Sequence, residues 1–444
     1  MTAGPAHGSN DPCCEDAGAP AAPRTWTVDE HLADVLTAAA PLPAVEVDLL
    51  DALGRPLAAD VTAAVDLPPF DNSSMDGYAL RSADAAPVAL AVVGDIAAGA
   101  AELPEVGPGQ AARIMTGAPV PPGADAVAPV EWTDGGSGTG EPADAMTAAA
   151  ADETVHETVQ VLRPVAAGAH IRRRGSDVTA GSTVLTAGTV LGPAQLGLLA
   201  AIGRATVTVR RRPRVAVLST GSELVQPGEP IGPGRISDSN SFTLAAAARA
   251  AGAEAVRIGG VPDDPAVLRR VLQEQLADAD LIVTSGGVSV GAYDVVKEAL
   301  QPLHGGEDLG GVDFRRLRMQ PGKPQGFGRL GADGVPLLAL PGNPVSSYIS
   351  FELFVRPLIR TMLGAPDVHR PVVPAVCTAD LTSPAGRRQF LRGRYGGDGT
   401  VTPVGGASSH LVGALAHADC LIAVPEETTV LPAGSRVDVV LLTD

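Results

Sequence analysis

The sequence predicts a multidomain α/β protein with additional β-domains, and two observations support this fold class. Residues 214–364 repeat a pattern of short apolar strand, loop and helix, which is typical of a mostly parallel sheet between two helical layers. Short strands separated by Pro- and Gly-rich turns occupy residues 86–165 and return from Pro371 onward. We therefore expect a central three-layer α/β/α domain, an inserted small β-domain, a helical and extended N-terminal linking domain, and a C-terminal β-barrel.

Composition sets approximate domain limits. Residues 1–24 are rich in Gly, Ala and Pro and cannot bury enough apolar surface to offset the entropy of ordering, so we expect a disordered tail. The glycine-rich, low-complexity segment 133–157 is interpreted as a flexible hairpin tip. The predicted limits are 25–67 and 166–212 for the discontinuous linking domain, 68–165 for the inserted β-domain, 213–365 for the α/β domain and 370–444 for the barrel.

Charge and cysteine content restrict the function. The 444-residue chain has a formal net charge of −18, which argues against a broad nucleic-acid or membrane-binding surface. An anionic ligand would then need local arginines or lysines, backbone amides or a metal. The four cysteines form no CxxC spacing, and the chain shows neither a secretory leader nor a long apolar run. We expect free thiols and a cytoplasmic protein.

The chain is organised around the stretch 279–294. Its apolar strand at 281–283 runs into a turn that contains Gly286, Gly287 and Gly291 and then into a helix start near Tyr293. Free amides in such a turn favour anions, and so does the positive end of the helix. Asp294 is unexpected there, since a carboxylate either caps the helix or holds a cation that bridges to the anion.

Polar residues also follow the other predicted strands. Glu223, Asp263 and Asn343 each fall in the segment beyond the carboxyl end of a predicted strand, as Asp294 does. Parallel strands end at one edge of their sheet, so these side chains should meet in a ligand crevice. Asp263 and Asp264 are also expected to cap the helix that follows them.

A cationic segment lies between the third and fourth of these strands. Residues 315–318 contain three arginines, and Lys323 stands between Gly322 and Pro324. Positive side chains fixed beside an acidic crevice are hard to explain as a solvated surface. We expect an oxyanion site here.

Four other motifs leave alternatives open. Residues 70–79 contain two carboxylates, an Asn, two hydroxyls and a Tyr, and form either a functional loop or an Asx- and Ser-stabilised turn. Thr116 taken alone is a structural turn residue. Arg172, Arg173 and Arg174 make either a solvated turn or an anion-facing loop. The same choice between solvent and ligand applies to Arg387, Arg388, Arg392 and Arg394.

Six motifs in order give the chain a family resemblance. From about Thr27 to its C-terminus it resembles the molybdopterin molybdenumtransferase family, the MoeA type to which the C-terminal part of gephyrin also belongs. The motifs are Phe70-Asp71-Asn72-Ser73-Ser74-Met75-Asp76-Gly77-Tyr78-Ala79, Met115-Thr116-Gly117-Ala118-Pro119, Ser219-Thr220-Gly221-Ser222-Glu223-Leu224, Ser285-Gly286-Gly287-Val288-Ser289-Val290-Gly291, Pro321-Gly322-Lys323-Pro324 and Pro341-Gly342-Asn343-Pro344, together with Asp294.

The resemblance implies a reaction and an assembly. Adenylyl-molybdopterin and molybdate would give molybdenum cofactor and AMP with Mg²⁺, on a homodimer whose active cleft is shared between chains. The molybdopterin adenylyltransferase and the acceptor molybdoenzymes would be further partners. Positions that match the family's active cleft are Asp71, Thr116, Asp177, Glu223, Asp263, Asp294, Lys323, Pro341 and Pro344.

Combined with that resemblance, the residues receive expected roles. Asp294 with Asp263 or Glu223 would hold Mg²⁺, and Asp71 and Thr116 would join them in catalysis. Substrate would contact Gly286, Gly287, Ser289, Gly291, Asn343, Pro341, Pro344, Lys323 and Asp177. Many relatives carry Lys where this chain has Gln320, so Arg316 or Arg318 is expected to supply that charge. Ser222 stands where an acid is frequent.

Two other functions compete with this interpretation. A molybdopterin adenylyltransferase would share the central α/β fold, but it would lack the Asp71 loop, the Thr116 strand end and the C-terminal barrel. A gephyrin-like scaffold would keep the whole fold without turnover. Release of AMP from adenylyl-molybdopterin separates the enzyme from the scaffold.

Overall fold

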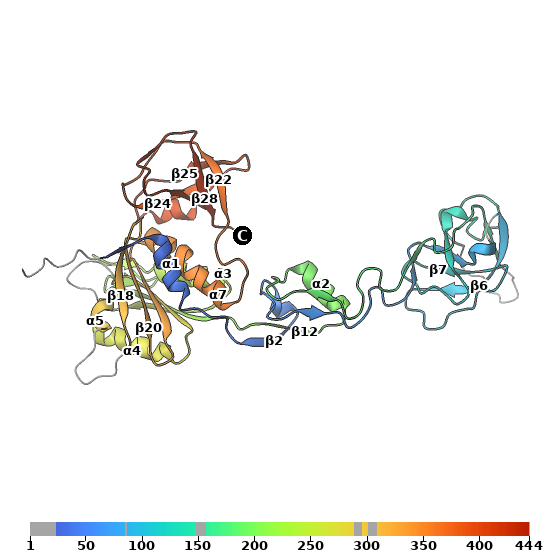
Figure 1. Ribbon diagram of the computed structural model, residues 1–444, viewed down its shortest axis with the longest axis horizontal. Coiled ribbons are helices and arrows are strands. Elements are labelled where there is room, and N and C mark those ends of the chain that lie inside the picture. The colour runs from blue at the N-terminus through green and yellow to red at the C-terminus, as the bar shows by residue number, and fades with distance from the viewer. Residues whose placement is uncertain (1–23, 85–86, 148–156, 288–294, 301–308, 444) are drawn as a thin grey trace, which may run out of the picture. The chain divides into compact units, whose positions relative to one another are not determined.

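The computed structural model describes residues 24–84, 87–147, 157–287, 295–300 and 309–443 (Figure 1). They form two compact units. The first unit combines residues 24–42 with residues 212–443, and the second unit contains residues 43–211. Within the described residues, no helix is long and apolar enough to cross a membrane.

The first unit is built on a seven-stranded sheet in the order β1-β18-β20-β21-β17-β13-β16. The neighbours β21, β17, β13 and β16 are parallel, as the sequence predicted, whereas β20 is antiparallel to both β18 and β21. The strands are β1 (Thr25–Trp26), β13 (Arg214–Thr220), β16 (Glu254–Val261), β17 (Leu281–Ser285), β18 (Val312–Leu317), β20 (Pro324–Leu330) and β21 (Val335–Leu340), with a short pair β14 (Leu224–Val225) and β15 (Ile236–Ser237) beside them.

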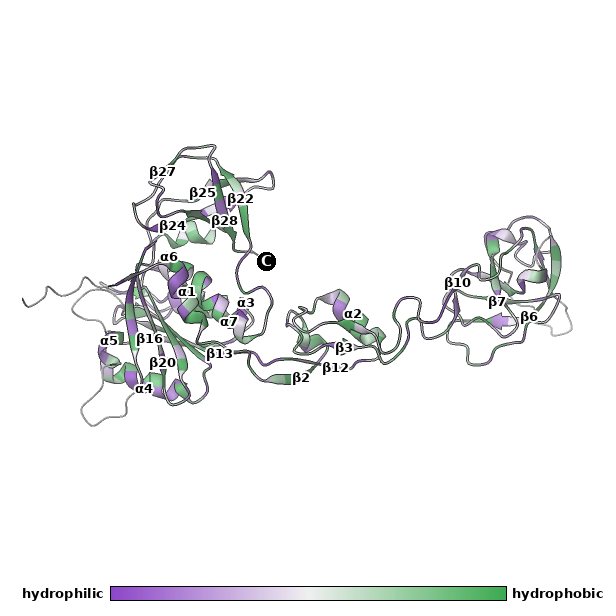
Figure 2. Ribbon diagram, viewed as in Figure 1, coloured by the Kyte–Doolittle hydropathy of each residue, from purple (hydrophilic) through white to green (hydrophobic). Residues whose placement is uncertain are grey.

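Alternating side chains of the central strands divide the core into two layers. Val215 and Val217 face one cluster with α3, α6 and α7, while Ala216 and Leu218 face another with α4 and α5. Figure 1 shows α4 and α5 on one side of the sheet and α1, α3 and α7 on the other, and Figure 2 shows polar and apolar residues together on α4. The predicted three-layer arrangement is confirmed. The helices are α3 (Asn240–Ala250), α4 (Pro265–Leu276), α5 (Val295–Ala299), α6 (Pro344–Ser350), the π-helical η4 (Phe351–Val355) and α7 (Arg356–Met362).

Helix α1 (Val28–Leu36) begins with the predicted capping box. The backbone N–H of Glu30 donates to Thr27 Oγ1 at 3.0 Å, and the Glu30 carboxylate accepts from the Thr27 N–H at 2.8 Å. The structure differs from the predicted linking domain 25–67, because buried Val35 of this helix belongs to the core of the first unit. The sequence shows that the helix has an apolar face, but not which sheet covers that face.

Five strands close a β-barrel in the C-terminal part of the first unit, as predicted. They pair in the order β24-β25-β22-β28-β26, and β26 pairs back with β24. Cys377 and Cys420 are buried free thiols in its core, as expected, whereas Cys13 and Cys14 lie outside the described residues. The elements are β22 (Val372–Cys377), β23 (Leu381–Thr382), β24 (Arg388–Tyr395), β25 (Thr400–Pro403), α8 (Val412–Ala416), β26 (Cys420–Val424), β27 (Val430–Leu431) and β28 (Arg436–Leu441).

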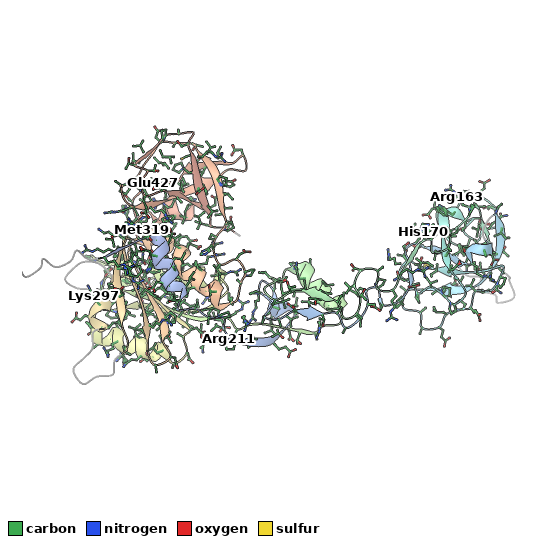
Figure 3. All side chains as sticks on the ribbon, viewed as in Figure 1. Arg163, His170, Arg211, Lys297, Met319 and Glu427 are labelled. Atoms are coloured by element: carbon green, nitrogen blue, oxygen red, sulfur yellow. The ribbon has the colours of Figure 1, made fainter. Side chains whose placement is uncertain are left out.

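A short strand joins the barrel to the α/β layers. Strand β19 (Met319–Gln320) follows β18 in the chain and pairs in parallel with β24 of the barrel. Met319, labelled in Figure 3 at this junction, is fully buried. The barrel is therefore tied to the sheet by backbone hydrogen bonds as well as by side chains.

The second unit contains the linking strands and the inserted β-domain. Strands β2 and β12 pair over five residues, and helix α2 packs on them. The inserted domain is a five-stranded sheet in the order β8-β5-β7-β6-β9, in agreement with the predicted β-domain. The elements are β2 (Ala44–Asp48), η1 (Leu50–Ala52), β3 (Val61–Thr62), β4 (Asn72–Ser73), β5 (Gly77–Leu80), η2 (Ser82–Asp84), β6 (Val88–Ile96), β7 (Gln110–Ile114), β8 (Ala126–Pro129), η3 (Val130–Trp132), β9 (Thr158–Val161), β10 (Ile171–Arg172), β11 (Thr183–Leu185), α2 (Pro193–Ala201) and β12 (Thr206–Arg210).

Asp134 organises the start of the segment that the sequence predicted to be a hairpin tip. Its side chain is 1% exposed and accepts hydrogen bonds from the backbone N–H groups of Gly136, Gly138 and Gln160 at 2.9–3.0 Å. A buried carboxylate that bonds three amides fixes the turn it belongs to. The glycine-rich composition of the segment did not predict this role of Asp134. Residues 148–156 of the segment lie outside the described residues.

Candidate functional site

A cleft of about 730 Å³ lies at the carboxyl ends of β13, β17 and β21 in the first unit. Parallel strands bring the loops that follow them to one edge, where the sequence predicted a crevice. Six predicted site residues line the cleft: Glu223, Asp263, Gly286, Gly287, Asn343 and Pro344. The predicted residues Ser289, Gly291 and Asp294 lie outside the described residues.

The turn after β17 needs glycine at two positions. Gly286 and Gly287 have φ angles of +97° and +65°, in the left-handed region. A Cβ on Gly286 would lie 2.6 Å from the Thr220 carbonyl oxygen, and one on Gly287 would lie 2.7 Å from Val296 Cγ2. The buried Thr220 hydroxyl beside this turn has no hydrogen-bond partner among the described residues. The cleft thus presents closely approaching backbone to a ligand, with the buried Thr220 hydroxyl packed behind the turn.

The acidic side of the cleft is held by neutral partners. The Ser222 N–H donates to Asp263 Oδ2 at 2.9 Å, and the Asp263 N–H donates to Ser222 Oγ at 3.1 Å. Asp264 alone caps α4, through the N–H groups of Ala266 and Val267. The expectation that both aspartates cap this helix is therefore wrong for Asp263, which is turned toward the Ser222 loop and keeps its charge uncompensated.

Asn240, the first residue of α3, joins three loops of the cleft and was not among the site residues that the sequence predicted. Its Nδ2 donates to Ser285 Oγ at 2.8 Å and to the Gly342 carbonyl at 2.7 Å. Ser347 Oγ donates to the same Ser285 hydroxyl, which in turn donates to the Pro341 carbonyl at 3.3 Å. The available signal was its place in the polar run Asp238-Ser239-Asn240-Ser241 at the start of a helix. These bonds hold the predicted Pro341 turn against the glycine turn.

The barrel supplies His410 to the cleft, a residue that the sequence analysis missed. Buried Arg392 of β24 anchors the loop that carries His410. It is 2% exposed and donates to the Ser408 carbonyl at 3.3 Å. From the other side, the Val345 N–H donates to the Ser409 carbonyl at 3.0 Å. Burial lowers the pKa of Arg392. Arg392 is thus a loop anchor, which matches neither the solvated nor the ligand-facing alternative.

Arg315 is structural and does not belong to an oxyanion site. Its guanidinium is 8% exposed and donates to Asp34 Oδ2 at 2.6 Å and to Asp313 Oδ2 at 2.8 Å. In β18 the side chains of Arg315 and Leu317 are buried, while Arg316 is exposed. The expectation that this cationic segment forms an oxyanion site is therefore wrong for Arg315, because the segment is a strand whose alternate side chains are buried.

None of the predicted residues Lys323, Gln320 and Arg316 lines the cleft. Arg316 lies in β18, Gln320 in β19, and the exposed Lys323 directly before β20. Gln320 Oε1 accepts a hydrogen bond from Arg387 Nη1 at 3.3 Å. The resemblance led us to expect Arg316 or Arg318 beside Gln320, but the structure places Arg387 there because β19 pairs with the first residues of β24.

In the second unit, Asp71 is held by the arginine turn. Its carboxylate accepts from Arg173 Nη1 at 2.6 Å and from the Arg174 N–H at 2.7 Å. These bonds, that from the Arg174 amide first, lower the pKa of Asp71. Arg174 also donates to Asp66 at 2.6 Å. The basic turn therefore faces carboxylates of its own chain, with the predicted Asp177 exposed nearby.

Thr116 lines a pocket of about 610 Å³ in the inserted β-domain. Its N–H donates to Asp76 Oδ1 at 2.6 Å. Arg113, 4% exposed, lies on the same wall and pairs with Asp95 at 3.0 Å and with Glu157. Thr116 forms the backbone hydrogen bond of a turn residue and also lines a pocket. A structural role and a ligand-binding role are therefore compatible at this position.

The cleft carboxylates suit a magnesium ion. Among the described residues, no three His, Cys, Asp or Glu side chains gather as a metal site, and neither Glu223 nor Asp263 pairs with a Lys or Arg. Mg²⁺ commonly uses one or two protein carboxylates together with waters and substrate phosphates. Two unpaired carboxylates beside hydroxyl oxygens fit that preference.

Comparison with known proteins identifies the class first. Residues 216–361, which contain the cleft, match a family model described as a probable molybdopterin binding domain. Residues 26–203 match the MoeA N-terminal region (domain I and II), and residues 374–442 match the MoeA C-terminal region (domain IV). A solved MoeA protein of molybdopterin biosynthesis from Pyrococcus horikoshii is 31% identical with a TM-score of 0.76, covering 95% of this chain and 100% of the other.

Relatives along nearly the whole chain are more specific. Molybdopterin molybdenumtransferase 2 of Mycobacterium tuberculosis is 46% identical, over 93% of this chain and 98% of its own length. The molybdopterin molybdenumtransferase of Bacillus subtilis is 36% identical, over 89% of each chain. The chain belongs to the molybdopterin molybdenumtransferase family of MoeA type, a transferase family of molybdenum cofactor biosynthesis, as its motifs indicated.

Proposed function

We propose that this chain inserts molybdate into adenylyl-molybdopterin and releases AMP. One observation carries the proposal: a glycine turn and two carboxylates without cationic partners among the described residues converge on one cleft. A phosphoanhydride needs donors for its oxygens and a counter-charge for its negative groups. The cleft offers the donors directly and the counter-charge through a cation. The names of the relatives support the same reaction.

Each side of the cleft then has a role. The Gly287 amide donates to a phosphate oxygen of the substrate, whereas the Gly286 N–H is bonded to the Leu340 carbonyl and holds the turn on the sheet. Glu223 and Asp263 hold Mg²⁺, which when bound offsets the negative charge of the phosphoanhydride. Asn240 holds the Gly286 turn against the Pro341 turn, so that donors and carboxylates act on one substrate molecule.

The test is AMP release from adenylyl-molybdopterin by the purified chain. Turnover that needs both molybdate and Mg²⁺ is the expected result. A molybdopterin adenylyltransferase would instead consume ATP and molybdopterin, and a scaffold would release no AMP. Either outcome would contradict the proposal.

Lys323 gives a prediction for the molybdate arm of this reaction. It is an exposed cation directly before β20, fixed between Gly322 and Pro324. Lys323→Ala should raise the molybdate concentration for half-maximal AMP release by about tenfold, the value of one charged hydrogen bond. Adenylyl-molybdopterin binding should change little. An unaltered molybdate dependence would move the oxyanion site to Arg387 and Gln320.

We further propose a homodimer with a shared active site, as the family resemblance implies. Asp71→Ala and Asp294→Asn chains should each be inactive alone and complement each other when refolded together. Random pairing makes half of the dimers heterodimers with one intact site of two, so about a quarter of wild-type AMP release should return. Verified heterodimers without recovered activity would show that both residues act within one chain.

A further inference from the structure

The pocket of the inserted β-domain has features that the proposed chemistry at the cleft does not use. Its lining includes Met75, Met115 and Met146, half of the six methionines in the whole chain. Thioethers are polarisable and adapt to flat ring systems. A concentration of methionines in one pocket of a domain with few aromatics therefore suits the faces of a planar ring.

Four carboxylates line the same pocket, and they differ in their partners. Asp76 accepts from the Thr116 N–H, and Asp95 is paired with Arg113. Glu131 and Asp144 are exposed to the pocket and make no hydrogen bond or ion pair with another described residue. An ionised carboxylate can only accept hydrogen bonds. The ligand must bring N–H donors to these two side chains.

An arginine, Arg113, also lines the pocket, and its charge is already paired. Arg113 is 4% exposed, its two terminal nitrogens bond Asp95 and Glu157, and its Nε has no partner among the described residues. Its positive charge is thus offset within the protein, and the pocket stays negative. Phosphate groups are repelled by such a lining, so a neutral ring with adjacent donors fits it better.

We propose that this pocket binds the aminopyrimidinone ring of a pterin. The proposal rests on the proposed function, in which the substrate has a pterin at one end, an adenine at the other and phosphates between them. A pterin presents an N–H and an amino group side by side, with a carbonyl next to them, and the two adjacent donors match a carboxylate. The Watson–Crick edge of adenine presents one donor beside one acceptor and cannot donate twice to a carboxylate.

The experiment measures binding of free 6-hydroxymethylpterin to the full-length chain by the pterin fluorescence. Glu131→Gln and Asp144→Asn keep the side-chain shape and remove the charge, and each should raise the Kd about tenfold. Glu141→Gln is the matched control, because Glu141 is an exposed acid of the same segment that does not line the pocket. It should leave the Kd unchanged. Circular dichroism verifies that all variants are folded.

Competition identifies the ring. Guanosine has the same donor edge as a pterin and should displace it, whereas adenosine should not. The assignment is overturned if wild type does not bind the pterin, if Glu131→Gln and Glu141→Gln bind it equally, or if adenosine competes as well as guanosine. These outcomes are independent of AMP release: normal turnover without pterin binding refutes only this inference, and pterin binding without turnover refutes only the proposed function.

Discussion

The cleft of the first unit and the arginine turn of the second unit both hold predicted carboxylates, but they hold them differently. The Asp263 carboxylate accepts from the Ser222 amide, a neutral group, while the Asp263 backbone N–H donates to the Ser222 hydroxyl. Asp71 bonds the guanidinium of Arg173 together with an amide. A carboxylate with neutral partners can bind an external cation because its negative charge is not compensated. The charge of a carboxylate paired with arginine is already compensated within the protein. The comparison separates a candidate metal ligand, Asp263, from a carboxylate that an arginine already neutralises, Asp71.

The largest predicted effect tests the backbone on which the cleft depends. Gly286→Ala should lower the rate of AMP release by about a hundredfold or more, because its Cβ would lie 2.6 Å from the Thr220 carbonyl and displace the turn. Strain at a φ of +97° should also lower the melting temperature. The measurements are steady-state turnover and thermal unfolding.

Gly197→Ala is the control for that substitution. Gly197 lies in helix α2, where an added Cβ meets nothing within 4 Å, so alanine should stabilise the protein by about 0.5–1 kcal/mol and leave turnover unchanged. Wild-type activity in Gly286→Ala would show that the turn does not need glycine for its function.

The second effect separates charge from capping in two neighbouring acids. Asp263→Asn keeps an oxygen for the Ser222 N–H but removes the charge, so the Mg²⁺ concentration for half-maximal turnover should rise about tenfold with stability retained. Asp264→Ala should do the reverse: it removes the cap of α4, costs about 1 kcal/mol and leaves the Mg²⁺ dependence alone. If both variants showed the same Mg²⁺ dependence as wild type, Asp263 would be no metal ligand.

The smallest effect at neutral pH concerns His31, which is buried in the first unit between Phe327 and Phe354. Burial first, and then Arg315, lowers its pKa from 6.5 to about 3. Between pH 6.5 and about 3, His31 is therefore protonated in the unfolded chain and neutral in the folded chain. Above pH 6.5 His31 is neutral in both states, and its protonation does not lower the free energy of unfolding. As the pH falls from 6.5 toward 3, the free energy of unfolding decreases by up to about 1.4 kcal/mol per pH unit.

His31→Phe removes this titration while keeping a ring of similar shape. Its free energy of unfolding should fall less steeply than that of wild type between pH 6 and about 4, as measured by denaturant unfolding at each pH. His170, which is half-buried in the second unit, provides the control His170→Phe. Equal slopes for wild type and His31→Phe would mean that His31 is charged in the folded protein.

Much of the fold and the centre of the site followed from the sequence, because they depend on local patterns. The apolar strand 281–283 and the glycines after it require a buried parallel strand and a tight turn wherever they occur. The Thr27 capping box is likewise complete within four residues. Strand order then brought Glu223, Asp263 and Asn343 to the same edge, since parallel strands end together.

What only the tertiary structure decided is which distant segment meets each charged side chain. In the sequence, nothing distinguishes Arg315 and Arg392 from surface arginines. In the structure, Arg315 is buried against α1 and Arg392 anchors the loop that carries His410. Arg387 reaches Gln320 through a pairing of strands nearly seventy residues apart. Local pattern fixes whether a residue lies in a strand, a turn or a helix end. The partner of a long charged side chain depends on chain segments that pattern does not relate, and only folding brings them together.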